Sequence, residues 1–410
     1  MEEKKTAQAD LVPSRGGTAL VPVEDTLGYW GKNARRLRAL SRVLLLVLVV
    51  FLIVFTTLNY RAFSPLNIYY FGQDLKSLPT QVGGGAKTLY YDYGGEGAAV
   101  VAYRGGAAVA GRESVKIYAT DGALLLSMAL DKPMTAPRAA VSRDYLIVYD
   151  FGSTDYLVFN AHDLLFTGES EAPILGVGLS DAGCFSLIVA SDKSLSAVEL
   201  FDAGFGHTHT FGRASATVAA PLSGDGRTLA LVGATNEGAV VDFITFGEME
   251  PRASVTFEGF PLAADFTRDG VLSVLTTKGL FTVTTMGKTL DTVDFAGATP
   301  TAYEISGEGA VVALLENTLT GASRVITVNR RGKLQSEVTM PTEVTAVCVD
   351  DRYVYALSGE TATVYERKKG AVKTSMPIST GYLGVSPTEN GVARVFYPAV
   401  ALPLSAKEWI

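Results

Sequence analysis

Two patterns of apolar residues divide this chain. Residues 43–58 form one unbroken run, VLLLVLVVFLIVFTTL, whereas from Lys87 onward short runs of β-branched and aromatic residues are interrupted by Gly, Asp and Asn. The unbroken run predicts a transmembrane helix, since it spans about 24 Å at roughly 1.5 Å per residue and its flanking residues extend it towards a hydrocarbon core of about 30 Å. The short interrupted runs predict β-strands joined by tight turns.

The charges around the apolar run predict its orientation. Arg61 follows it, and five basic residues precede it: Lys32, Arg35, Arg36, Arg38 and Arg42. An excess of positive charge keeps that side of a membrane helix in the cytoplasm, so we expect the C-terminal part to lie outside the plasma membrane. A cleaved signal peptide and a buried core helix are the alternatives. The long preceding region, and the lack of a small-x-small site after Leu58, favour an uncleaved signal anchor.

Two classes of turn recur along the strand-rich part. The first class recurs at intervals of 39 to 47 residues, at Gly97, Asp144, Gly183, Gly226, Gly270, Gly309, Asp351 and Gly391. The second class lies between these positions at intervals of 38 to 45 residues, at Gly122, Asp163, Gly204, Gly247, Gly287, Gly332 and Gly370. Two hairpins in a period of about 42 residues give four antiparallel strands, which is one blade of a β-propeller.

The count of turns predicts an all-β fold, an eight-bladed β-propeller, with seven blades as the alternative. A β-sandwich gives no reason for a constant period, and a solenoid repeats at about 20 to 30 residues. The chain ends without a last hairpin, so the eighth blade lacks an outer strand. Because a ring closes without exposed edges, we expect the segment before the first blade, residues 77–82, to supply that strand.

These patterns predict five regions. Residues 1–38 are a disordered basic cytoplasmic tail, 39–60 a transmembrane signal anchor and 61–76 a linker. Residues 77–403 form the extracytoplasmic propeller, and 404–410 are a C-terminal tail.

Charge narrows the choice of partner. The chain carries 35 Lys and Arg against 42 Asp and Glu. Residues 1–61 hold nine of these basic and five of these acidic residues, which leaves 26 against 37, a net charge of −11, for the remainder. An acidic exterior argues against nucleic acid as a partner and leaves cationic ligands and proteins open.

The chain resembles an uncharacterised bacterial family in the order of its parts, which are a basic tail, one membrane helix and the blades. Strands that carry the resemblance include SVKIYATDGALL, DYLVFNAHDLLF and RVITVNRRGKLQSEV. Members of this family are single-pass, membrane-anchored β-propeller proteins of unknown function. The pattern is more loosely similar to WD40-like and quinoprotein-like propellers. This resemblance implies no catalytic residues, because the family has none established.

The residues that could carry chemistry are few. His207 and His209 would share a face of a strand, but a third metal ligand is missing nearby. Cys184 and Cys348 fall in blades three and seven, too far apart for a disulfide, and we interpret both as core residues. The glycine-rich segments lack the GKS or GKT ending of a phosphate loop. We therefore assign no catalytic, cofactor-binding or metal-binding residue, and no cofactor.

Two functional classes remain. The first, which we favour, is a binding or scaffolding propeller of the cell envelope, with an envelope protein or a glycan as partner and the membrane as its anchor. The second is a propeller enzyme or a quinoprotein-like cofactor-binding protein with a site on the central axis. The exterior domain has Trp409 as its one tryptophan, whereas quinoproteins show repeated tryptophan motifs. Residues near strand ends that could contact a partner are Tyr303, Arg324, Tyr353 and Tyr382.

Overall fold

The computed structural model describes residues 38–51, 53–54, 69, 72, 87–388 and 391–406. The chain divides into two compact units, Met1–Lys76 and Ser77–Ile410. In the first unit, residues 38–51 and 53–54 are helical, and their large apolar side chains are exposed. None of the helices in the described ranges is both long enough and apolar enough to cross a membrane. Of the predicted tail only Arg38 is described, and of the predicted linker only Tyr69 and Gly72. The anchor over 39–60 stays a prediction.

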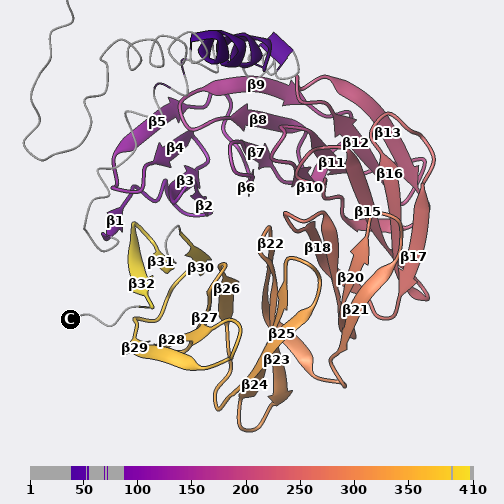
Figure 1. Ribbon diagram of the computed structural model, residues 1–410. Coiled ribbons are helices and arrows are strands. Elements are labelled where there is room, and N and C mark those ends of the chain that lie inside the picture. Colours follow the sequence, from indigo (N-terminus) through magenta and orange to yellow (C-terminus); the bar gives the residue numbers. More distant parts are fainter. Residues whose placement is uncertain are drawn as a thin grey trace, which may run out of the picture. The chain divides into compact units, whose positions relative to one another are not determined.

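The second unit is an eight-bladed β-propeller, as the turn spacing predicted (Figure 1). Its described strands form eight four-stranded antiparallel sheets, and from the first blade to the eighth the first strands of successive blades contact each other. The first four blades are β2–β5 (Ala99–Tyr103, Gly106–Ala110, Ser114–Tyr118, Leu124–Ala129), β6–β9 (Pro137–Val141, Leu146–Asp150, Asp155–Phe159, Leu164–Glu169), β10–β13 (Ile174–Leu179, Phe185–Val189, Ser196–Phe201, His207–Arg213) and β14–β17 (Ala216–Ala219, Thr228–Thr235, Gly238–Thr245, Ala253–Phe257). The next three are β18–β21 (Pro261–Phe266, Val271–Thr276, Gly279–Thr284, Thr289–Asp294), β22–β25 (Thr299–Ser306, Gly309–Asn317, Ala322–Asn329, Leu334–Met340) and β26–β29 (Ala346–Val349, Tyr353–Ser358, Thr361–Glu366, Val372–Pro377). The last blade consists of β30 (Gly384–Pro387), β31 (Val392–Tyr397), β32 (Val400–Ser405) and β1 (Leu89–Tyr90).

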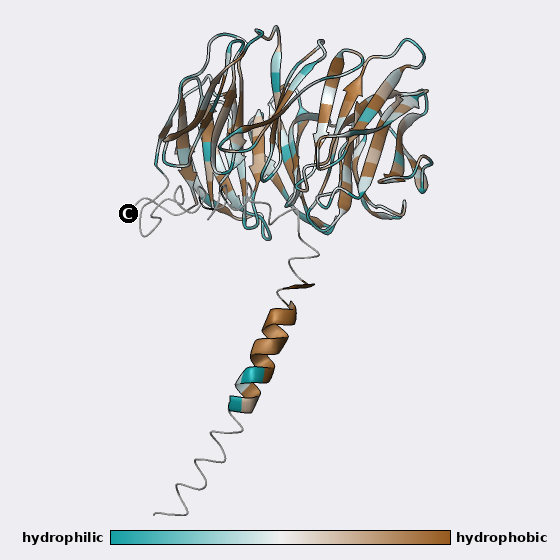
Figure 2. Ribbon diagram, turned by 90° about the horizontal axis from the view of Figure 1, so that it is seen from above, coloured by the Kyte–Doolittle hydropathy of each residue, from teal (hydrophilic) through white to brown (hydrophobic). Residues whose placement is uncertain are grey.

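Packing between blades explains which strands are apolar. Every residue of the second strand β19 is buried, because neighbouring blades cover both faces of its sheet. The outermost strand β21 instead alternates between exposed and partly buried residues, since one of its faces meets solvent. One core cluster joins Ala230 of β15 to Leu272 of β19, so each core lies between two blades. Figure 2 shows the corresponding apolar bands along the strands.

The two classes of turn have the structural meaning that the sequence predicted, with one exception. In blades two to eight, the first class joins the first and second strands, and the second class joins the third and fourth strands of blades one to seven. Gly97 was assigned wrongly, because it lies between β1 and β2. The equivalent turn of the first blade is Arg104–Gly105, where both residues adopt positive φ, 48° and 75°. Arginine is an uncommon residue at such a position, so the turn lacks the usual Asn-Gly or Asp-Gly signal.

The ring is closed by both ends of its sheet-forming segment. β1 pairs antiparallel with β32, with Leu89 opposite Ala401 and Tyr90 opposite Val400. Closure by a segment before the first blade is thus confirmed, but its predicted position at 77–82 is wrong, and those residues lie outside the described ranges. The closing strand has two residues, too few to show a β-period in the sequence. β32 also continues to Ser405, beyond the predicted propeller end at residue 403.

A buried arginine links the last blade to the first. Arg394 of β31 is 1% exposed, and its guanidinium reaches across to the first blade. It donates hydrogen bonds to the carbonyl oxygens of Gly105, Thr120 (2.7 Å) and Lys87 (3.5 Å). Burial lowers the pKa of Arg394. None of the ion pairs found among the described residues includes Arg394. Its positive charge is therefore stabilised by the dipoles of the backbone carbonyl groups.

Candidate functional site

The ring has two faces, each built from a different kind of connection. The turns between second and third strands and the linkers between blades lie on one side, here called the linker face. The turns between first and second strands and between third and fourth strands lie on the opposite side, here called the turn face. Successive connections of an antiparallel sheet must alternate between its two ends, so each blade contributes to both faces.

The turn face neutralises its own charges. Its described connections carry 13 basic and 12 acidic side chains. Many of them form ion pairs with one another: Arg143–Asp181 (2.7 Å), Arg227–Asp225 (3.8 Å), Arg268–Glu308 (2.5 Å), Arg330–Asp269 (3.6 Å), Arg331–Asp269 (3.7 Å) and Arg352–Asp351 (3.6 Å). Such exposed pairs add little stability. Because the opposite charges nearly cancel, the turn face has almost no net electrostatic field.

The linker face keeps an uncompensated negative charge. Its connections carry ten acidic and four basic side chains. Nine of the acidic residues are exposed and form none of the ion pairs found in the described part: Glu96, Glu113, Asp131, Glu171, Asp192, Glu237, Glu258, Glu343 and Glu360. Like charges gathered on one face without partners raise the electrostatic energy of the free protein, and a cationic ligand would lower it.

Large apolar side chains interrupt this acidic face. Leu175, Phe260 and Leu383 lie at the beginnings of three inner strands, close to the axis of the ring, and are 44%, 55% and 49% exposed. Further out, Leu195 and Leu319 lie on two of the longer connections between second and third strands, with exposures of 70% and 95%. An apolar and acidic surface of this kind suits a partner better than it suits water.

Two carboxyl groups lie on the inner strands near the turn face. Burial raises the pKa of Asp265 on β18 to about 7 and that of Glu304 on β22 to about 8. Glu304 accepts a hydrogen bond of 2.7 Å from the Val349 amide, which opposes the shift. A different carboxylate adds to each shift, Asp181 for the first and Asp350 for the second. The two groups are therefore perturbed separately and do not form a coupled acid–base pair.

Glu304 should make stability depend on pH. As pH rises from about 4.5 to about 8, the unfolded chain releases the Glu304 proton while the folded chain retains it, so the wild-type protein loses stability across this window. Glu304→Gln removes that loss and can still accept the Val349 hydrogen bond. We expect the difference in unfolding free energy between variant and wild type to grow by about 1–3 kcal/mol from pH 4.5 to 8. Urea denaturation at several pH values measures it. Glu248→Gln, at an exposed turn-face position, is the control, and a constant difference for Glu304→Gln would contradict the assignment.

The residues that the sequence suggested as contacts have different surroundings. Tyr303, on β22, is 45% exposed. Arg324 is held by Glu316 and Glu337, and its Nη2 donates a hydrogen bond to a backbone carbonyl, so its role is structural. Tyr382 contacts the Thr345 hydroxyl on the linker face. Tyr353 packs beside Tyr355 with ring centroids 6.5 Å apart.

The two cysteines lie in the blades that the repeat predicted, and His207 and His209 lie on one strand. His207 and His209 are on β13, an outermost strand, and His207 Nε2 lies 2.9 Å from the Thr210 hydroxyl. Cys184 and Cys348 are both buried, in the third and seventh blades. Within the described ranges, no group of three or more His, Cys, Asp or Glu residues is placed to hold a metal ion.

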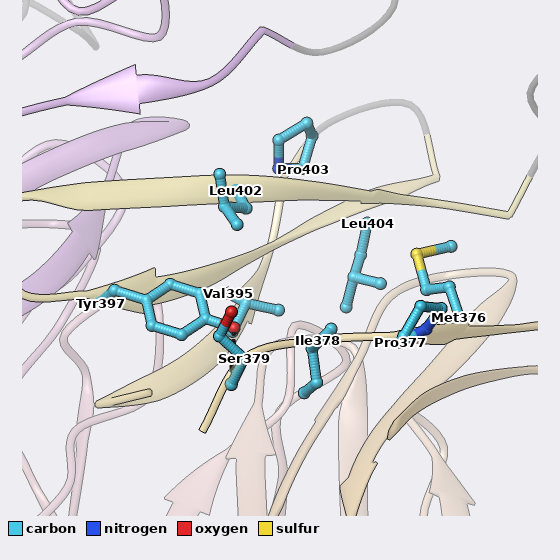
Figure 3. A pocket seen from close by; sticks show the side chains of 9 residues that line it. All are labelled: Met376, Pro377, Ile378, Ser379, Val395, Tyr397, Leu402, Pro403 and Leu404. Carbon is cyan, nitrogen blue, oxygen red and sulfur yellow. Dashed lines mark hydrogen bonds between the residues drawn. The ribbon is translucent and has the colours of Figure 1, made fainter. Parts of the chain in front are cut away.

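A groove of about 330 Å³ lies beside the closing strand, between β29 and the last blade. Figure 3 shows its nine lining side chains, which are mostly apolar and include no charged residue. The groove borders the part of β32 beyond Ala401 that β1 does not pair with. Pro403 lies there and has no N–H, which is typical of an edge protected against strand addition. We therefore attribute the groove to the short closing strand and do not assign it as the site.

This chain is similar to one family model and to several solved structures. The model of a family described as "Family of unknown function (DUF5711)" matches residues 90–396. The computationally designed Ika8 protein has a TM-score of 0.58 at 13% identity, over 77% of this chain and 99% of Ika8. Saccharomyces cerevisiae Sqt1 has a TM-score of 0.55 at 10% identity, over 78% and 98%. BamB from Moraxella catarrhalis gives 0.49 at 13% identity, over 77% and 98%. None of the curated proteins matches this chain.

Proposed function

The chain belongs to the family of unknown function DUF5711, and we propose that it is a binding or scaffolding propeller, anchored in the plasma membrane, that engages an envelope partner through its linker face. The observation that carries this proposal is the contrast between the two faces. The turn face balances 13 basic against 12 acidic side chains, whereas the linker face leaves nine exposed carboxylates unpaired among the described residues, beside exposed apolar side chains.

A binding role requires no catalytic residue, metal ion or cofactor. A rigid ring holds its connections in fixed positions, so little conformational freedom is lost when a partner docks. The predicted anchor over 39–60 would confine the ring to the membrane surface. That confinement raises the local concentration of any membrane-associated partner.

An enzyme with a site on the axis is the second candidate, and Asp265 and Glu304 are the residues that favour it. Their pKa values, about 7 and about 8, suit proton transfer near neutral pH. Binding is preferred because these two groups are perturbed by different neighbours. Turnover of an envelope substrate that is lost in Glu304→Gln or Asp265→Asn would establish the enzyme instead.

Cysteine labelling of intact cells tests the proposed placement. Met249 is 68% exposed on the turn face, and both native cysteines are buried, so a membrane-impermeant maleimide should give little background. We expect Met249→Cys to be labelled from outside and Thr6→Cys to be labelled only after lysis, because the basic cluster precedes the apolar run. The reverse pattern would contradict an extracytoplasmic ring.

A further inference from the structure

The apolar side chains around the axis of the linker face are only partly covered in the free ring. Leu175, Phe260 and Leu383 each begin or precede an inner strand, and about half of each side chain is exposed to water. Exposed apolar area costs about 25 cal/mol per Å² relative to burial, so covering these three side chains would favour association. They come from blades three, five and eight and therefore surround the axis on this face.

Unpaired carboxylates lie on the inter-blade linkers of the same face. Glu171 precedes Leu175 in the linker that leads to blade three, and Glu258 precedes Phe260 in the linker that leads to blade five. Glu343 lies in the linker that leads to blade seven. All three are exposed, and none forms an ion pair in the part of the chain that the structure describes.

Hydrogen bonds hold the linker backbones in place. The Phe260 N–H donates to the Thr277 hydroxyl (3.0 Å), and the Phe260 carbonyl accepts from the Thr277 N–H (2.9 Å). The Glu171 N–H donates to the buried carboxylate of Glu199 (3.1 Å). These bonds fix the positions from which the exposed side chains project. A ligand therefore meets a preorganised surface.

We propose that the partner presents a basic protein segment with interspersed apolar residues, and that this segment docks around the axis of the linker face. The inference rests on the proposed function and names the chemistry of its partner. Lysine and arginine side chains would pair with carboxylates that the ring leaves uncompensated, while apolar side chains of the segment cover the exposed leucines and phenylalanine. The same field repels nucleic acid and anionic lipid surfaces.

Isothermal titration of the full chain in detergent tests the proposal. The probe is a 16-residue peptide that repeats Lys-Leu-Lys-Lys, and the same peptide with Glu for Lys is its control. We expect saturable binding of the basic peptide at 50 mM salt that weakens steeply at 300 mM. The triple variant Glu171→Gln, Glu258→Gln, Glu343→Gln should lose at least tenfold in affinity. Matched turn-face changes, Asp121→Asn, Glu248→Gln and Glu250→Gln, should leave the affinity unchanged.

A second pair of variants tests the apolar contribution. Phe260→Ser with Leu383→Ser should weaken binding severalfold, whereas Met249→Ser with Met286→Ser on the turn face should not. Circular dichroism melting verifies that each variant is folded. Three results would overturn the proposal. The first is absence of peptide binding at 50 mM salt, and the second is an affinity of the Glu171, Glu258, Glu343 variant equal to that of the wild type. The third is binding to phosphatidylglycerol vesicles through the same residues. In those cases a partner crosslinked to the linker face would still support the proposed function.

Discussion

Replacing Arg394 with methionine is expected to lower the free energy of unfolding by about 3–5 kcal/mol. The guanidinium is 1% exposed and donates to three carbonyl oxygens, all contributed by residues before or within the first blade. Methionine fills similar space but donates no hydrogen bond, so these buried acceptors would lose their partners. The loss falls at the point where the last blade meets the first. Denaturation by urea, followed by circular dichroism, measures the effect.

Arg227→Met is the matched control. The Arg227 side chain is 85% exposed, and its only ion pair in the described part, with Asp225, has a distance of 3.8 Å. We expect this substitution to change stability by no more than about 0.5 kcal/mol. Similar unfolding free energies for the two variants would show that Arg394 does not secure the closure.

The repeat could be predicted from sequence because blades two to seven all use the same two turns. Asp144 and Gly332, for example, lie at the hairpins that their spacing assigned to them. The first blade differs, since Arg104 adopts a positive φ that is otherwise found mostly at glycine in the described turns. The closing strand was misplaced for a similar reason. Leu89 and Tyr90 are recruited by pairing with β32, a tertiary interaction that leaves no local pattern.

The candidate site could not be found from sequence, because its residues are distributed over the whole ring. Glu171 and Glu343 are far apart in the chain and belong to one face through the topology of the blades. Once the two turn classes are known, the connections between them can be sorted into two faces, and the excess of acidic residues on one of them becomes visible. The ion pairs, in contrast, could not be predicted from the sequence. Arg324, for instance, looks like a free cation in the sequence but is held by two carboxylates.

The contrast between the two faces fits the proposed binding role. Ion pairs such as Arg143–Asp181 and Arg268–Glu308 keep the turn face hydrated and nearly neutral. The linker face concentrates negative charge, which speeds encounter with a cationic surface and disfavours anionic ones. Exposed Leu319 would then contribute apolar contact after docking.

Site-specific photocrosslinking in cells tests the central claim, that the linker face binds a partner, most directly. A benzophenone amino acid is placed at exposed linker-face positions Asn236, Lys193 or Thr320, or at turn-face positions Met249, Met286 or Lys369. The account predicts that a discrete protein adduct forms from the linker-face positions and not from the turn-face positions. Adducts from the turn face, with none from the linker face, would contradict it.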